Sequence, residues 1–198
     1  MQTRILEQAA ELFIKSGIRS ITMDEIAESL GMSKRTLYEY FPNKEKLLKE
    51  CILYKHKIYS EEMKQLLDII DNPLEIIHIH ISKAIKNISQ IHPNFSKDLK
   101  KYHPKILQDV FLPLKEKNTA YTKEVITRGK KQGYFRQDID PDIMADLIHI
   151  QFHRLDEFPL DRHPKTEVFK HIVMGLIRGM ATEKGMKNIK QLFENENN

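Results

Sequence analysis

The sequence predicts an all-α fold in which a small three-helix N-terminal domain is joined by a long helix to a larger helical domain. Three observations predict it. Apolar residues recur three and four positions apart along most of the chain. Glycine and proline are sparse, with 7 and 8 among 198 residues, and stand mainly where helices would end or begin. Residues 21–41 read as two short helices joined by a tight turn.

The first short helix has clear start and stop signals. Thr22 and Glu25 fit a capping box, in which each side chain accepts a hydrogen bond from the other residue's backbone amide. Ile21 and Ile26 stand where they form a hydrophobic staple over the cap. Gly31 ends the helix because glycine tolerates the left-handed conformation required there.

The second short helix starts after Ser33 and ends before Pro42. A helix of this length is not stable alone in water, so its inner face must pack on the neighbouring helices. Its first turn and outer face carry cations and hydroxyl groups, which suit phosphates and base edges in DNA. The candidate DNA-binding residues are Ser33, Lys34, Arg35, Thr36, Tyr38 and Tyr40.

Two further helices flank this pair. One starts near Thr3 and ends at Gly17, and the other is capped by Asn43 and runs from Lys44 to about residue 70. Lys44 lies in a first turn, where a cation is unfavourable for the helix dipole, so a nearby phosphate would compensate. Lys44 is therefore a further candidate for DNA binding. Thr22 is another, although its hydroxyl is also needed for the capping box.

The rest of the chain predicts six more helical segments, two of them on either side of Pro113. Asn72-Pro73 and Asp140-Pro141 each place a capping residue before a proline at the first helical position. Pro113 is expected to kink or break a helix. The expected helices span about 73–91, 94–102, 104–132 with the break at Pro113, 141–157 and 166–184.

The spacing of residues in the first quarter of the chain resembles the TetR family of bacterial transcription regulators. The residues that carry the resemblance are Ile5, Ala9, Leu12, Phe13, Gly17, Thr22, Ile26, Ala27, Gly31, Ser33, Leu37, Tyr38, Tyr40, Phe41, Lys44 and Leu47. The resemblance implies a helix-turn-helix DNA-binding domain over residues 1–48 and a helical regulatory and dimerisation domain over residues 49–198.

The resemblance also implies a homodimer. In the family, the last two long helices pair with those of a second copy, and here these are about 141–157 and 166–184. The dimer would present two reading helices ~34–36 Å apart to a pseudo-palindromic operator. The expected interface residues are Met144, Ile148, Leu155, Phe169, Ile172, Val173, Gly175, Leu176, Gly179 and Met180.

Family members usually hold a small-molecule effector inside the second domain. The candidate pocket residues here are His78, Phe95, Phe111, Tyr121, His149 and Phe152. We expect an effector to favour a conformation with the wrong separation of the reading helices, which would weaken DNA binding. The identity of the effector, the operator and the controlled genes is not encoded in these residues.

Charge by itself does not argue for DNA binding. The formal net charge is +4, and residues 1–48 contain seven cations and seven anions. Residues 97–136, in contrast, carry eleven cations and four anions. This segment is either a solvated helical face, an anionic-ligand site or a second polyanion contact.

The cysteine content and the hydropathy of the chain predict its compartment. The single cysteine, Cys51, falls at an apolar helical position and predicts core packing in a reducing cytoplasm. No signal peptide or membrane span is evident, so we expect a cytoplasmic protein without a membrane partner.

Nine histidines raise the question of a metal or catalytic site. His149 and His153 are four residues apart on one helix face, but two ligands do not make a metal site. No glycine-rich phosphate loop or catalytic motif occurs, so we expect no enzyme, no cofactor and no metal.

The sequence thus predicts a ligand-responsive transcription regulator, most often a repressor in this family, which binds double-stranded operator DNA as a homodimer. Two alternatives stay open. One is a helical dimeric interaction module without operator binding, favoured by the neutral N-terminal domain, and the other is a His-dependent metal-sensing protein.

Overall fold

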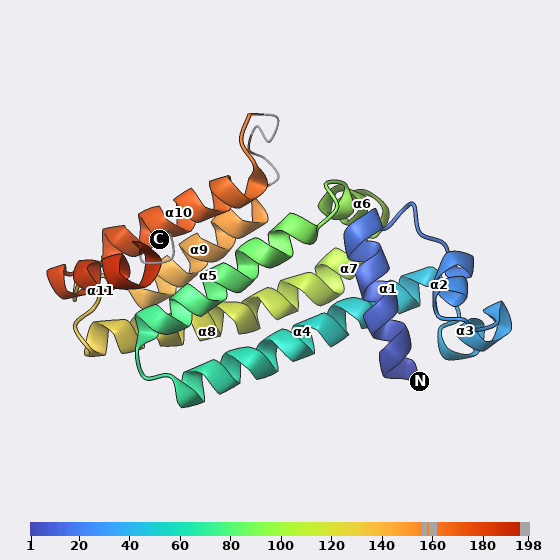
Figure 1. Cartoon of the computed structure of the whole chain (residues 1–198), viewed down its shortest axis with the longest axis horizontal. Helices are drawn as coiled ribbons and strands as arrows, with labels where there is room; N and C mark the ends of the chain where they lie inside the picture. The colour runs from blue at the N-terminus through green and yellow to red at the C-terminus, as the bar shows by residue number, and fades with distance from the viewer. Residues whose placement is uncertain (156–157, 159–161, 195–198) are drawn as a thin grey trace. The chain divides into compact units, whose positions relative to one another are not determined.

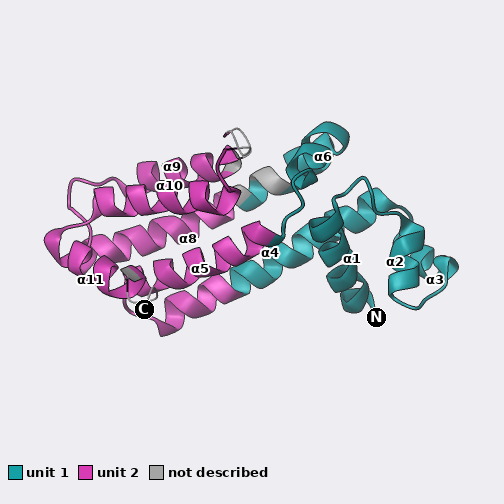
Figure 2. Ribbon diagram, turned by 45° about the horizontal axis from the view of Figure 1, so that its top comes forward, with its two compact units in different colours: residues 1–61, 90–114 teal, residues 62–89, 115–198 magenta. Residues whose placement is uncertain are grey.

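The structure is a computed structural model that describes residues 1–155, 158 and 162–194. Within these residues it is helical, apart from an isolated antiparallel bridge between Phe135 and Ala181. The chain forms two compact units, shown in two colours in Figure 2. Unit 1 comprises residues 1–61 and 90–114, and unit 2 comprises residues 62–89 and 115–198.

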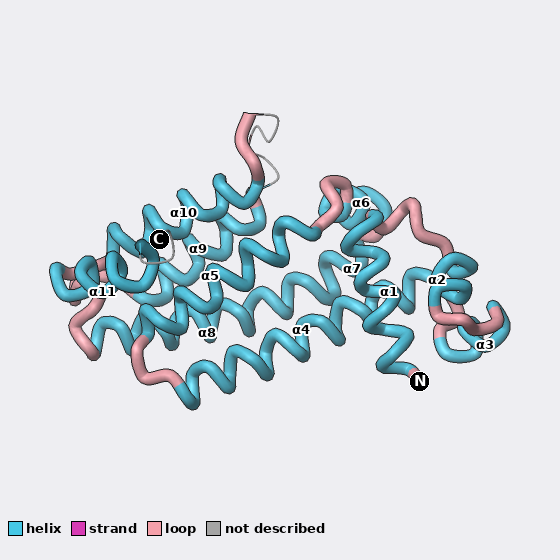
Figure 3. The backbone as a smooth tube through the Cα atoms, viewed as in Figure 1, coloured by secondary structure: helices cyan, strands magenta, loops and turns pink. Residues whose placement is uncertain are grey.

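The predicted all-α fold is therefore confirmed. The helices up to the middle of the chain are α1 (Gln2–Ser16), α2 (Met23–Ser29), α3 (Lys34–Tyr40), α4 (Lys44–Ile69), α5 (Pro73–Gln90), α6 (Phe95–Tyr102) and α7 (Pro104–Ile106). A π-helical segment, η1 (Leu107–Phe111), follows, and then come α8 (Leu112–Lys131), α9 (Pro141–His153), α10 (Lys165–Met180) and α11 (Glu183–Glu194). Figures 1 and 3 show their order along the chain.

Unit 1 is built around the apolar stripe of α1. Ile5, Ala9 and Phe13 are almost fully buried, together with Leu37 on α3 and Leu47 on α4. These side chains form one continuous core, so the short α3 is held by tertiary packing and not by its own helix propensity. The predicted division at residue 48 does not coincide with the edge of this unit, because α6, α7 and η1 also pack on its core.

Pro113 does not end the helical path. It lies in the first turn of α8, directly after the π-helical segment. Proline has no backbone N–H and its ring collides with the carbonyl four residues earlier, so a regular α-helix cannot continue through it. The π-helical turn at Leu107–Phe111 widens the backbone just before this point.

Unit 2 has a second core made by α5, α8, α9, α10 and α11. Phe135, Phe169, Ile177 and Met180 are among its most buried side chains. The last predicted helix ends earlier than expected, at Met180, and Gly185 does not terminate it. Residues Met180–Thr182 instead pair with the segment after α8, where Arg136 N–H donates to the Met180 carbonyl (3.0 Å).

Helix α11 was not predicted. Thr182 starts it: its backbone N–H donates to the Tyr134 carbonyl (3.0 Å), and its hydroxyl oxygen accepts the Gly185 N–H (3.1 Å). Ile189 is buried in the unit 2 core, with Leu192 and Phe193 packed against it. The apolar spacing of these residues was the signal that would have revealed the helix.

No helix in the described part of the chain is long and apolar enough to cross a membrane.

Gly185 offers a test of the packing of α11. A Cβ atom added to Gly185 would lie 2.2 Å from the Tyr134 carbonyl oxygen, so the two segments would have to separate. We expect Gly185→Ala to lower the free energy of unfolding by about 1–3 kcal/mol, although alanine usually favours a helix. Denaturant unfolding measures this, with Met186→Ala at an exposed neighbouring position as the control. A Gly185→Ala protein as stable as the wild type would contradict the close approach.

Candidate nucleic-acid interface

The start of α2 is fixed by the predicted capping box. The Thr22 hydroxyl accepts the Glu25 N–H (3.2 Å), and the Glu25 carboxylate accepts both the Thr22 N–H (2.7 Å) and the Thr22 hydroxyl (2.8 Å). These hydrogen bonds from the Thr22 backbone and side chain lower the pKa of Glu25. The Thr22 hydroxyl thus both donates and accepts a hydrogen bond within the protein, and the Glu25 carboxylate lies beside it.

The start of α3 is capped as predicted. The Ser33 hydroxyl accepts the Thr36 N–H (3.1 Å), and the Ser33 and Thr36 hydroxyl groups lie 2.8 Å apart. These contacts orient both side chains at the N-terminal turn of the reading helix. The remaining free amide groups of that turn point away from the helix, where they suit a phosphate.

Both cations of α3 are paired with carboxylates of the same domain. The Lys34 ammonium lies 2.5 Å from an Asp24 carboxylate oxygen, and Arg35 Nε lies 3.1 Å from a Glu39 carboxylate oxygen. All four side chains are more than half exposed, so the pairs open at little free-energy cost when a phosphate competes. The two cations of α3 are thus neutralised by ion pairs, in a segment of residues 1–48 whose formal charge is zero.

Two tyrosines provide the exposed face of α3. Tyr38 and Tyr40 are 46% and 43% exposed, whereas Leu37, directly before Tyr38, is buried. The core thus determines which face of the helix meets solvent. Exposed aromatic rings with hydroxyl tips on a reading helix suit hydrogen bonds to phosphates and contacts with thymine methyl groups.

Lys44 lies differently from the other candidates. Its side chain is partly buried, with the ammonium 5.9 Å from the centre of the Phe13 ring. Burial lowers its pKa, while the nearby carboxylates of Asp98 and Glu25 oppose this shift. Lys44 is therefore held at the junction of α1, α4 and α6, and a phosphate contact would require its side chain to turn outward.

The candidate pocket residues belong to different compact units. Phe95 packs on the core of unit 1, and Phe111 belongs to η1 in the same unit, with its side chain outside the described residues. His78, Tyr121, His149 and Phe152 belong to unit 2. The six candidates are therefore divided between unit 1 and unit 2.

Within unit 2, two of these aromatic residues pack against neighbours. The ring of His78 meets Phe193 edge-on with the centroids 4.7 Å apart, and Phe152 lies 4.6 Å from Phe169. Both contacts belong to the unit 2 core.

Two polar neighbours of the predicted residue His149, namely Thr122 and His80, were missed by the sequence reasoning. His149 Nε2 lies 3.0 Å from the Thr122 hydroxyl, and His149 also acts electrostatically on His80. Burial lowers the pKa of His80 to about 4, with smaller contributions from His149 and Lys83. His80 is therefore neutral near pH 7. The pattern Ile77-His78-Ile79-His80-Ile81 places two histidines on an apolar segment, but it does not show which groups each of them contacts.

The expected dimer-interface residues fall into three groups. Leu155, Phe169, Val173 and Met180 are buried in the core of their own subunit, so they present no surface to a second copy. Gly175 and Gly179, in contrast, have open space in front of them. Met144, Ile148, Ile172 and Leu176 are partly buried.

An apolar stripe on α9 was not among the predicted interface residues. Ile143, Leu147 and Ile150 are 59%, 37% and 41% exposed and follow one another at helical spacing. They were overlooked because periodicity alone does not tell the inner stripe of an apolar helix from its outer stripe.

The described residues bear on two further predictions, that of no metal site and that of a buried Cys51. No group of three or more potential metal ligands occurs among the described residues, and the side chain of His153 lies outside them, as do Asp156 and Glu157. Cys51 is buried in the unit 1 core, which raises its pKa to about 12. Its thiol is therefore inert, as predicted from its apolar position.

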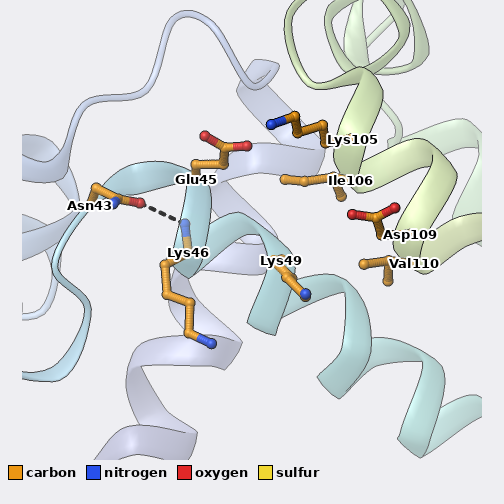
Figure 4. A pocket seen from close by; sticks show the side chains of 8 residues that line it. All are labelled: Asn43, Glu45, Lys46, Lys49, Lys105, Ile106, Asp109 and Val110. Atoms are coloured by element: carbon orange, nitrogen blue, oxygen red, sulfur yellow. Dashed lines mark hydrogen bonds between the residues drawn. The ribbon is translucent and has the colours of Figure 1, made fainter.

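A pocket of about 280 Å³ opens in unit 1 between the start of α4 and the α7–η1 segment (Figure 4). Its walls carry charges of both signs over an apolar floor of Ile106 and Val110. The polar lining residues are Asn43, Glu45, Lys46, Lys49, Lys105 and Asp109. Asn43 also caps α4, because its side-chain oxygen accepts the Lys46 N–H (2.8 Å).

The geometry of α2 and α3 defines a helix-turn-helix unit with an exposed reading helix. Residues 5–51 match the family model described as bacterial regulatory proteins, tetR family. The chain belongs to the TetR family and is a helix-turn-helix, DNA-binding transcriptional regulator, a class that is not enzymatic.

Named relatives extend beyond this domain. The chain is 28% identical to the uncharacterized HTH-type transcriptional regulator YvaF of Bacillus subtilis over 194 residues, covering 92% of this chain and 97% of that protein. It is 26% identical to the HTH-type transcriptional repressor KstR2 of Mycobacterium tuberculosis over 147 residues, covering 73% of this chain and 74% of that protein.

A solved structure shares the fold over nearly the full length. It is a putative transcriptional regulator from Saccharomonospora viridis in complex with choline, with a TM-score of 0.74 and 21% identity. The alignment covers 92% of this chain and 98% of that protein.

Proposed function

We propose that this protein is a ligand-responsive repressor that binds a pseudo-palindromic operator as a homodimer. The observation that carries the DNA-binding part is the exposed outer face of α3, held rigid by the burial of Leu37 in the unit 1 core. The repressor KstR2 of Mycobacterium tuberculosis, which resembles this chain over most of its length, supports repression as the mode of control.

The proposed contacts follow from the positions of the side chains. Ser33 and the first turn of α3 bind a phosphate, and Lys34, Arg35 and Thr36 reach the major groove or its rim. Tyr38 and Tyr40 contact phosphates or a thymine methyl group. Lys44 and Thr22 contribute less, because one is drawn into the junction with Asp98 and the other is used in the capping box.

Homodimerisation is proposed through α9 and α10. The exposed stripe of Ile143, Leu147 and Ile150 lies on one of the two helices that the family uses for this purpose. A second copy would remove this apolar stripe from water, and the open positions at Gly175 and Gly179 allow a close backbone approach. An isologous interface would then place two copies of α3 in successive major-groove turns.

The effector is proposed to bind in unit 2, near His80, His149 and Thr122. These are polar groups inside an otherwise apolar bundle, a combination typical of small-molecule sites. The choline complex of the Saccharomonospora viridis protein supports a small-molecule effector for this fold.

The two alternatives from the sequence make different demands. An interaction module without operator binding would not depend on the outer face of α3. A metal sensor would require more histidine ligands than the described residues bring together.

The double variant Lys34→Ala plus Arg35→Ala tests DNA binding. We expect affinity for the intergenic DNA upstream of its own gene to fall roughly 10- to 100-fold and the salt dependence to weaken, because two phosphate or base contacts are lost. Electrophoretic mobility shifts at several salt concentrations measure both. The control is Lys15→Ala plus Lys57→Ala, which also removes two exposed cations from ion pairs within helices. Unchanged affinity and salt slope in the α3 variant would favour the interaction module.

Leu147→Glu plus Ile150→Glu tests the dimer. We expect a folded monomer with weakened operator binding, because four carboxylates would meet across the two-fold axis. Light scattering after gel filtration gives the mass, and Met186→Glu, at an exposed apolar position of α11, is the control. A variant that stays dimeric would exclude this face of α9.

A small-molecule screen tests the effector site. Any compound that raises the thermal midpoint of the wild type should also weaken operator binding, because it prefers the conformation that does not fit DNA. The gain in thermal midpoint should vanish in His149→Leu and persist in His171→Leu, whose imidazole lies on the surface of α10. Compounds that bind in unit 2 and leave operator affinity unchanged would refute this mechanism.

A further inference from the structure

The positive charge of unit 1 does not come from its helix-turn-helix segment. The unit contains 14 lysines and arginines and 11 aspartates and glutamates, whereas residues 1–48 are neutral. Most of the surplus comes from residues 90–114, with four cations and two anions, and the rest from residues 49–61. The cations of residues 90–114 are Lys97, Lys100, Lys101 and Lys105, which we call the α6–α7 lysines.

The two sets of cations are also treated differently by the fold. On the reading helix, Lys34 and Arg35 are each paired with a carboxylate. The α6–α7 lysines are all exposed, and within the described residues none of them forms an ion pair. Their charges are therefore not neutralised by a direct ion pair, whereas those on α3 are.

The acidic residue nearest to these lysines is occupied elsewhere. One carboxylate oxygen of Asp98 accepts the Arg19 N–H (3.0 Å), in the loop between α1 and α2. The Arg19 guanidinium also donates to the Tyr102 hydroxyl (3.3 Å) and lies over that ring, 5.4 Å from its centre. These contacts attach α6 directly to the loop that leads into α2.

The contact with Arg19 groups positive charge around an exposed aromatic ring. Lys101 places its ammonium 5.2 Å from the centre of the Tyr102 ring, which is 43% exposed. Arg19, Lys101 and Tyr102 thus form one surface cluster. Arg19 itself lies three residues before Thr22, the N-cap of α2. Cations beside an exposed tyrosine suit a phosphate chain.

We propose that the α6–α7 lysines form a second contact surface for the phosphate backbone of DNA, outside the helix-turn-helix motif. Lys105 extends this surface to the pocket beside α4, which Lys49 also lines (Figure 4). Lys46 lines the pocket too, but its ammonium is paired with Glu50 (2.8 Å). The contact is independent of base sequence, so it raises affinity and association rate for any duplex while α3 selects the operator. The proposal rests on DNA binding by this protein, as proposed above.

The two carboxylates of the pocket argue against a dedicated small-anion site. Glu45 and Asp109 line the same opening as Lys49 and Lys105, so a small anion held inside would be repelled by both. A DNA backbone passing over the rim needs only the lysines that project from it. Inorganic pyrophosphate therefore serves as the probe for the small-anion reading.

The test uses the full-length protein and a duplex of arbitrary sequence, about 30 base pairs long. The variant is Lys101→Ala plus Lys105→Ala, and the control is Lys187→Ala plus Lys190→Ala, two exposed lysines of α11. Both variants lose the same charge. We expect the α6–α7 variant to bind roughly tenfold more weakly at ~50 mM salt, with a salt slope smaller by about two, and the control to match the wild type. The two variants should have the thermal midpoint of the wild type, because all four side chains are exposed.

Three results would overturn the inference. One is a salt slope equal to that of the wild type, and another is an equal loss in the control, which would indicate net charge alone. The third is loss of pyrophosphate binding with unchanged DNA binding, which would assign a small-anion site. Lys34→Ala plus Arg35→Ala separates this inference from the proposed function: if that variant loses operator preference while the α6–α7 variant binds DNA normally, only the second surface is refuted.

Discussion

The burial of one face of α3 is the constraint on which the DNA-binding unit depends. The helix has seven residues, too few to be stable alone, and its conformation is held by Leu37 and by Phe41 at its C-terminal end. Both side chains enter the core that α1 builds with Ile5, Ala9 and Phe13. Because the inner face is fixed in this way, the direction of Tyr38 and Tyr40 is fixed too. Caps at Thr22 and Ser33 then set where each helix of the motif begins.

Electrostatics in unit 1 follows from a second constraint. A reading helix that carried free cations would bind any polyanion, whereas ion pairs with Asp24 and Glu39 moderate this attraction. The lysines of α6 and α7, in contrast, form no ion pair within the described residues, and α6 is attached to the loop before α2 through Arg19. In the proposed arrangement, α3 selects the operator sequence, and the α6–α7 lysines attract the phosphate backbone of any duplex.

Unit 2 shows why a pattern that predicts helices does not predict their partners. The apolar spacing of α9 and α10 predicts helices, but it does not show which apolar positions are covered within the subunit. The structure shows that Phe169, Val173 and Met180 satisfy part of that demand within the subunit, whereas Ile143, Leu147 and Ile150 remain exposed. Likewise, Thr182 hydrogen-bonds to Tyr134 and starts α11. This residue was predicted to lie inside the last helix, near its end, but it lies between α10 and α11.

The sequence by itself determined the local structure: the capping box of Thr22 and Glu25, the cap at Ser33, the helix starts at Asn72-Pro73 and Asp140-Pro141, and the spacing that places the chain in its family. Each of these depends on residues a few positions apart, where a side chain reaches a nearby backbone amide without help from the rest of the fold. The tertiary structure decided which ionisable groups are paired, which apolar stripes stay exposed, and what the half-buried histidines of unit 2 contact. Those outcomes depend on contacts between residues far apart in the chain, such as Arg19 with Asp98 or Thr122 with His149, which no local pattern encodes.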